Sequence, residues 1–167
     1  MTEDLKIVLW PDPILRRIMP DTDFEDTTET VNELEKQVAI RLATERPFVG
    51  LAANQIGIEH RVCVIQRNDD TWLSLINPHI VYYGSEVEVM IEGCGSLPEI
   101  QIPIIRPVEI LVQHDTHYDN GPHTEETILQ DWEARIAQHE IDHLNGILIV
   151  DRYYPDPEAR FGINDES

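Results

Sequence analysis

The segment Gln138-His139-Glu140-Ile141-Asp142-His143 constrains this 167-residue chain more than any other. Residues four apart lie on one face of an α-helix, so the imidazoles of His139 and His143 can each give a nitrogen to one metal ion. Glu140 follows the first of these ligands and can reach a water molecule held at that metal. The alternative is an amphipathic helix that happens to contain two histidines. The spacing favours the metal site.

A catalytic metal usually has three protein ligands and one open position for water, so a third ligand is required. Extended metalloprotease motifs supply a third histidine six residues after the second, where this chain has Ile149. Glu158, a possible downstream acidic ligand, lies in a proline-flanked tail. Cys94 lies between two glycines, and a thiolate with two imidazoles suits zinc or ferrous iron. The best third ligand is therefore Cys94, with a buried structural cysteine as the alternative.

The charge of the chain excludes one class of partner. It has 32 acidic and 12 basic residues and a formal net charge of −20, which repels a phosphate backbone and argues against direct nucleic-acid binding. The acidic start Met1-Thr2-Glu3-Asp4 and the lack of a run of roughly twenty apolar residues predict neither a secretory signal nor a membrane span. We therefore expect a cytoplasmic protein with free thiols at Cys63 and Cys94.

The length fits one domain, which we assign to residues 1–152, followed by a short acidic tail, residues 153–167. An amphipathic helix is predicted from about Asp26 to Thr44, because apolar residues recur at the helical period at Val31, Leu34, Val38 and Leu42. A second helix is predicted from Asp131, as N-cap, to Asn145, with Gly146 ending it.

The middle of the chain consists of short β-branched or aromatic runs bounded by Gly, Pro and Asn, which is typical of strands. We predict strands at residues 61–66, 72–76, 80–83, 86–91, 108–114 and 147–150. Asp119-Asn120-Gly121 reads as a hairpin turn. The expected fold is α+β, with antiparallel β-sheets packed around a central helix that carries the His-Glu-x-x-His motif.

Three motifs in one order resemble the signatures of the peptide deformylase family: Gly50-Leu51-Ala52-Ala53-Asn54-Gln55, Glu92-Gly93-Cys94-Gly95-Ser96, and Gln138 to His143. The resemblance covers about Leu5 to Arg152. It implies a metal-dependent enzyme that removes the formyl group from N-formylmethionine at the start of nascent chains. It also implies one divalent metal ion, Fe²⁺ natively with Zn²⁺, Ni²⁺ or Co²⁺ as substitutes, on Cys94, His139 and His143.

The same resemblance assigns the remaining roles. Glu140 is implied as general base and acid, while the Gln55 amide and the backbone N–H of Gly95 are implied as donors to the oxyanion. The substrate is a formyl-Met nascent peptide. The acidic tail lacks the basic docking helix that some cellular relatives use, so contact with the ribosome is expected to be transient. The compartment is the cytoplasm, or that of a bacterial host if a phage encodes the chain.

The chain departs from the family pattern near the substrate. Gly95 replaces the usual leucine, and Phe48 replaces a glycine. The pocket for the methionine side chain is implied to include Phe48, Val49, Gly50, Trp132, Arg135 and Ile136, and an arginine there either alters the pocket or extends outward to solvent. Two alternatives remain: a zinc endopeptidase, and a deformylase-like domain that has lost activity and serves as a binding module.

Overall fold

The computed structural model describes residues 6–42, 48–118 and 121–155. A short 3-10 helix, η1 (Pro13–Arg16), precedes the long helix α1 (Phe24–Leu42). The predicted period is confirmed, because Leu34 and Val38 are completely buried against the sheet. The helix begins slightly before the predicted start, and the predicted end at Thr44 lies outside the described residues.

The larger sheet is antiparallel and has five strands in the order β1-β2-β3-β6-β7. These strands span Gly50–Ala52 (β1), Val62–Gln66 (β2), Trp72–Tyr83 (β3), Glu109–Tyr118 (β6) and Gly121–Gln130 (β7). A 3-10 turn, η2 (Ala53–Ile56), follows β1 directly. Because successive side chains of a strand point to opposite faces, Val62 and Val64 pack toward α1 while Cys63 and Ile65 pack toward α2.

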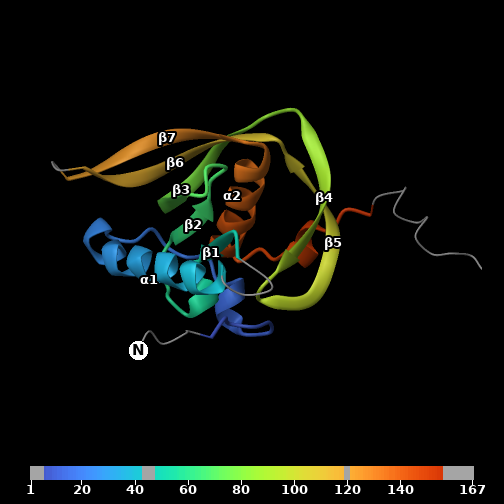
Figure 1. The fold of residues 1–167 in the computed structure, drawn as a ribbon, viewed down its shortest axis with the longest axis horizontal. Coiled ribbons are helices and arrows are strands. Elements are labelled where there is room, and N and C mark those ends of the chain that lie inside the picture. The colour runs from blue at the N-terminus through green and yellow to red at the C-terminus, as the bar shows by residue number, and fades with distance from the viewer. Residues whose placement is uncertain (1–5, 43–47, 119–120, 156–167) are drawn as a thin grey trace, which may run out of the picture.

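The second helix, α2 (Asp131–Leu144), lies between this sheet and a separate two-stranded antiparallel ribbon (Figure 1). The ribbon consists of β4 (Val87–Cys94) and β5 (Leu97–Pro107), and a last 3-10 turn, η3 (Ile149–Arg152), contacts both of its strands. The prediction of an α+β fold with antiparallel sheets around a central motif-bearing helix is confirmed. This arrangement brings the turn between β4 and β5 to the same region as α2.

Several local predictions were wrong. β3 is one strand rather than two, because irregularities near Asn77, which has φ 51°, are absorbed within it. Residues 147–150 do not form a strand: the Leu148 N–H donates to the Asp151 carboxylate and a 3-10 turn begins at Ile149. Asp131 is the first helical residue of α2, and Gln130 occupies the N-cap position. The first two residues of the predicted hairpin turn, 119–120, lie outside the described residues, although β6 and β7 flank them in antiparallel register.

The beginning of the predicted acidic tail contacts the ribbon. Tyr153 forms a β-bridge with Ile104, and the Tyr154 N–H donates to the Pro103 carbonyl at 2.9 Å. Residues 156–167 lie outside the described residues, so the boundary at 152 stays a prediction. Within the described ranges, neither α1 nor α2 is long and apolar enough to cross a membrane.

Candidate metal centre and active site

The rotation of α2 about its axis determines where its histidines point. One side of the helix is buried in the apolar cluster on the five-stranded sheet, through Ile136, Ala137, Ile141 and Leu144. His139 and His143 therefore lie near Cys94, the last residue of β4, and one ligand atom from each of the three residues lies within 4.8 Å of the others. The distance from Cys94 Sγ to His143 Nε2 is 3.2 Å.

This donor set fits a divalent transition metal. A thiolate and two imidazole nitrogens suit zinc or ferrous iron, and three protein ligands leave a position for water. Burial lowers the pKa of His143 well below its ordinary value, so the ring is neutral and its nitrogen lone pair is available to a metal. The predicted ligands Cys94, His139 and His143 are thus brought together by the fold.

Glu92 sets the orientation of His139. Its Oε2 lies 3.0 Å from His139 Nδ1, which leaves Nε2 of the ring for the metal centre. Arg106 of β5 donates to both oxygens of the same carboxylate, at 2.7 and 3.0 Å. Burial alone would raise the pKa of Glu92, but the hydrogen bonds from His139 and Arg106 hold that pKa well below its ordinary value.

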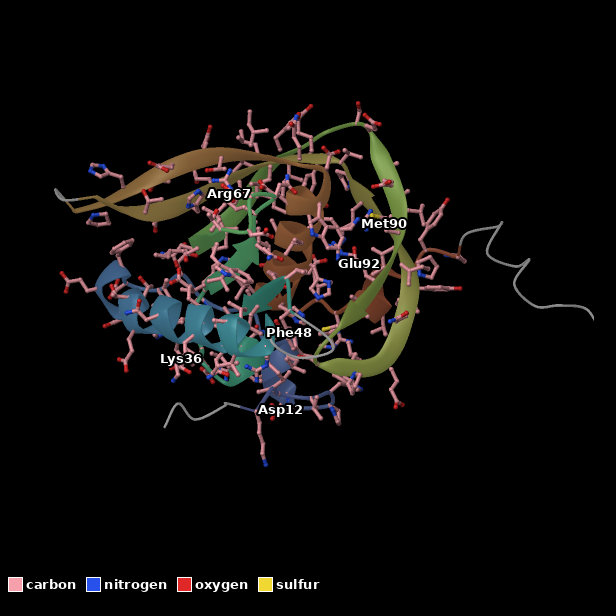
Figure 2. The ribbon with its side chains drawn as sticks, viewed as in Figure 1. Asp12, Lys36, Phe48, Arg67, Met90 and Glu92 are labelled. Carbon is pink, nitrogen blue, oxygen red and sulfur yellow. The ribbon has the colours of Figure 1, made fainter. Side chains whose placement is uncertain are left out.

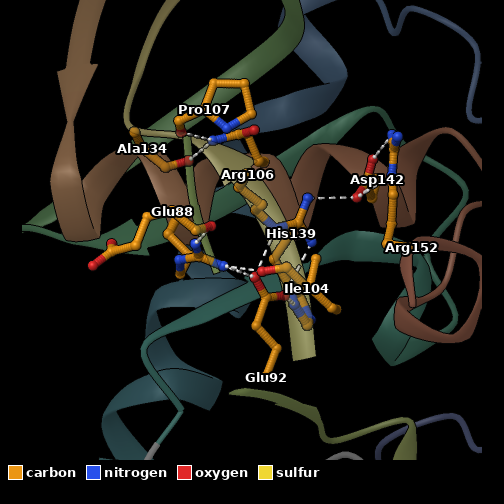
Figure 3. A network of polar contacts seen from close by, with 11 residues as sticks. Glu88, Glu92, Ile104, Arg106, Pro107, Ala134, His139, Asp142 and Arg152 are labelled. Atoms are coloured by element: carbon orange, nitrogen blue, oxygen red, sulfur yellow. Dashed lines mark hydrogen bonds and ion pairs between the residues drawn. The ribbon is translucent and has the colours of Figure 1, made fainter. Parts of the chain in front are cut away.

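Arg106 extends this buried network from His139 to Asp142, near the C-terminal end of α2. Its Nη1 donates to Asp142 at 2.8 Å, and Arg152 donates to the other oxygen of Asp142 at 2.7 Å. Figure 3 shows Arg106 between the carboxylates of Glu92 and Asp142. Because Asp142 directly precedes His143, the network supports α2 at both histidine positions.

Arg135 does not extend to solvent, so that alternative is wrong. The side chain is only 5% exposed, and its guanidinium donates to Glu92 Oε1 at 2.7 Å. It also donates to the backbone carbonyls of Ile104 and Glu88, at 3.3 and 2.8 Å. The positive charge is therefore neutralised by the carboxylate that orients His139. Trp132, one turn earlier on α2, is 44% exposed.

Glu140 is buried and directly follows the metal-binding candidate His139 on α2. Its Oε2 has no hydrogen-bond partner among the residues that the structure describes, and burial raises the pKa of Glu140 to about 7. A carboxyl group with this pKa can both accept and return a proton near neutral pH. A Cβ atom on Gly50 would lie 2.6 Å from Glu140 Oε1 and 2.7 Å from Ile136 Cγ2, so any larger residue there would displace these two side chains. Val49, just before it, packs against the cluster that contains Ile136.

Gln55 and Gly95 also reach this region. The Gln55 side chain accepts the Ala52 N–H at 3.0 Å and donates to Ser96 Oγ at 3.2 Å, so its amide lies against the turn that follows Cys94. Gly95 is the first residue of that turn. The edge of the Phe48 ring lies over it, since a Cβ atom at residue 95 would be 2.3 Å from Phe48 Cε1.

The roles of four residues were not predicted from the sequence: Arg106, Asp142, Arg152 and Asn54. The Asn54 amide supports His143, because it donates to the backbone carbonyl of His143 at 2.8 Å. One signal was available. Arg106 is a lone charge between the apolar run Ile102-Pro103-Ile104-Ile105 and Pro107-Val108, and a buried charge almost always has a partner. The identity of that partner could not be read from the sequence.

A Cys-His-His donor set beside a buried glutamate is the arrangement of a mononuclear metal hydrolase. The chain belongs to the polypeptide deformylase family, whose sequence model matches residues 4–158. The peptide deformylase of Thermotoga petrophila is 40% identical over 153 residues, covering 90% of this chain and 87% of that protein. That of Bartonella henselae is 37% identical over 149 residues, covering 87% and 81%.

Solved structures agree with this assignment. The peptide deformylase of Thermotoga maritima superposes with a TM-score of 0.78 at 36% identity, covering 92% of this chain and 99% of that one. A Met-Ala-Ser-bound class I type b peptide deformylase from Acinetobacter baumannii gives a TM-score of 0.76 at 28% identity, covering 91% and 99%. The family resemblance drawn from the three motifs is confirmed.

Proposed function

We propose that this chain hydrolyses the N-formyl group of N-formylmethionyl peptides at the start of nascent chains and releases formate. The observation that carries the proposal is Glu140, a buried carboxyl that directly follows the ligand candidate His139 on α2 and has one oxygen without a hydrogen-bond partner among the described residues. A titratable group of this kind next to a metal-binding set is suited to moving the proton of an attacking water. Family membership supports the same reaction.

In this proposal Cys94, His139 and His143 hold one divalent metal ion, Fe²⁺ natively, with Zn²⁺, Ni²⁺ or Co²⁺ able to substitute. When bound, the metal supplies Lewis acidity and makes hydroxide available near neutral pH. Glu140 takes the proton of the attacking water and later returns it to the leaving amine. The Gln55 amide and the Gly95 backbone N–H donate to the developing oxyanion, and loss of one such donor typically costs about 10²- to 10³-fold in rate.

The methionine side chain is proposed to bind beside Gly50 and Ile136, which lie next to Glu140. Val49, Trp132, Phe48 and Arg135 are proposed to border the same space. The Arg135 charge is satisfied by Glu92, so its aliphatic stem rather than its guanidinium would face an apolar substrate. The Met-Ala-Ser ligand of the Acinetobacter baumannii relative is consistent with a peptide that begins with methionine.

The partners follow from this substrate. We propose that the chain acts in the cytoplasm, or in a bacterial host if a phage encodes it, on peptides that leave the ribosome. Contact with the ribosome would be transient and without a basic C-terminal docking helix. The formal net charge of −20 supports the absence of direct nucleic-acid binding.

The test is release of formate from formyl-Met-Ala-Ser by anaerobically prepared protein loaded with Fe²⁺ or Ni²⁺. Glu140→Ala should lower kcat by about 10²- to 10⁴-fold with the metal retained, because a general base contributes about that much. Glu133→Ala is the matched control, since this buried glutamate of the same helix lies six residues before His139 and accepts the N–H of Asn68, in the connection between β2 and β3. It should keep wild-type kcat.

Other outcomes separate the alternatives. Cleavage of blocked internal peptides in place of formate release would identify an endopeptidase. Folded, metal-loaded wild type that turns over neither substrate would instead support a binding module and contradict the proposed reaction.

A further inference from the structure

Phe48 and Gly95, which come from separate segments of the chain, are in contact with each other. An ideal Cβ atom at Gly95 would lie 2.3 Å from Phe48 Cε1 and 2.5 Å from Phe48 Cζ, far inside any real contact distance. The ring of Phe48 therefore occupies the volume that a side chain at residue 95 would need. In Figure 2, Phe48 lies between α1 and the turn end of the β4–β5 ribbon.

The Phe48 ring is anchored to the body of the protein. It packs against the apolar cluster that contains Leu34 and Val38 of α1, and the Arg41 guanidinium lies 5.6 Å from the ring centroid. The next residue, Val49, accepts a backbone hydrogen bond from Gln66 of β2 at 2.7 Å. The position of the ring is thus set by α1 and by the five-stranded sheet, not by the turn it covers.

The turn after Cys94 is held on one side by polar contacts. Ser96 is completely buried, its carbonyl accepts the Trp10 N–H at 3.0 Å, and its hydroxyl accepts from Gln55 at 3.2 Å. Gly95 has no side chain with which to pack, and glycine allows more backbone motion than any other residue. The Phe48 ring covers the side of Gly95 from which a Cβ atom would project.

We propose that Phe48 is a positioning residue for the backbone N–H of Gly95. This inference rests on the proposed function of that N–H as an oxyanion donor. The ring restricts the backbone of Gly95 and so holds the donor at a fixed distance from the reacting carbonyl, where displacement by about 1 Å can cost about 10²-fold in rate. The same contact makes residues 48 and 95 interdependent: the ring requires glycine at residue 95.

The test is a double-mutant cycle of Phe48→Ala and Gly95→Ala, measured with formyl-Met-Ala-Ser on protein of known metal content. Phe48→Ala should lower kcat about tenfold, because an oxyanion donor acts mainly in the transition state, while any change in KM reports the methionine pocket that the ring is also proposed to border. Gly95→Ala alone should lower kcat to a similar extent, since the new Cβ collides with the ring. In the Phe48→Ala background, Gly95→Ala should change kcat by less than about threefold, because residues in contact are not additive.

Gly93→Ala is the matched control in both backgrounds. A Cβ atom there would lie 3.6 Å from the Ile100 carbonyl oxygen, an ordinary contact, so kcat should stay at the value of its parent. A second readout does not need turnover. In zinc-loaded protein, the ¹⁵N order parameter of the Gly95 N–H should fall in Phe48→Ala while that of Gly93 does not.

The inference is overturned if the two single effects multiply in the double variant, or if Phe48→Ala leaves both kcat and the Gly95 order parameter at wild-type values. If Phe48→Ala does not fold, Phe48→Leu takes its place, because leucine keeps the apolar contact and lacks the ring edge. If wild type itself releases no formate, the proposed function fails, and the order parameter of Gly95 alone decides the inference.

Discussion

Replacement of Arg106 by methionine probes the buried network behind the metal centre. Arg106 is 4% exposed and donates three hydrogen bonds to two buried carboxylates, Glu92 and Asp142. Methionine preserves much of the apolar volume but removes the charge that both carboxylates share. Removing one partner of a buried ion pair typically costs about 3–5 kcal/mol. Because Arg135 still pairs with Glu92 and Arg152 still pairs with Asp142, we expect the free energy of unfolding to fall by about 3 kcal/mol, near the lower end of this range.

The matched control is Arg152→Met. Arg152 donates to Asp142 as well, but its side chain is 44% exposed, so water can replace much of what it gives Asp142, and we expect its removal to cost only about 0–1 kcal/mol. The free energy of unfolding would be measured for both variants by urea denaturation of the chelator-treated protein. Zinc affinity, measured by competition, should also fall about tenfold in Arg106→Met, because Glu92 orients His139. Equal destabilisation by the two substitutions, or unchanged zinc affinity in Arg106→Met, would refute this reasoning.

Gly50→Ala should lower kcat by at least about tenfold and the free energy of unfolding by about 1–3 kcal/mol, since its Cβ would collide with Glu140 and Ile136. If Gly50→Ala kept the wild-type kcat and free energy of unfolding, Gly50 could not lie as close to Glu140 and Ile136 as the structure shows. Iodoacetamide at pH 8 should alkylate Cys94 but not Cys63 in chelator-treated protein, because burial raises the pKa of Cys63 well above its ordinary value and keeps its thiol protonated. Peptide mapping that finds Cys63 modified in folded protein would refute this. Chelation should abolish formate release and preserve the far-UV circular dichroism, since apolar clusters hold the fold; an unfolded spectrum would show a structural metal instead.

The sequence was sufficient for the family, the fold class and the two long helices. Helix α1 could be predicted because its apolar residues recur at a local period, and α2 because Gly146 ends it; both signals need no knowledge of the rest of the chain. The three ordered motifs carried the family assignment, which the family model and the relatives confirm. The roles given to Cys94, His139, His143 and Glu140 stay predictions, although the fold brings the ligand atoms of the first three together.

Strands β5 and β7 were missed for identifiable reasons. β5 contains Pro98, Pro103 and Pro107, which local reasoning takes as strand breakers, but it is an edge strand of a two-stranded ribbon where missing N–H donors are tolerated. β7 is polar along most of its length, with Ile128 and Leu129 only near its end, and it is a strand because it pairs residue by residue with β6. Such pairing depends on a partner elsewhere in the chain, and a local pattern does not contain it.

The sequence by itself determined which chemical groups this protein has and, through the helical period, that His139 and His143 share a face. Only the tertiary structure decided what surrounds them. Arg135 pairs with a carboxylate 43 residues earlier in the chain, and the Phe48 ring occupies the space beside Gly95. Helical spacing is a property of the local backbone, whereas the partner of a buried charge and the filling of a volume depend on segments that meet only when the whole chain folds.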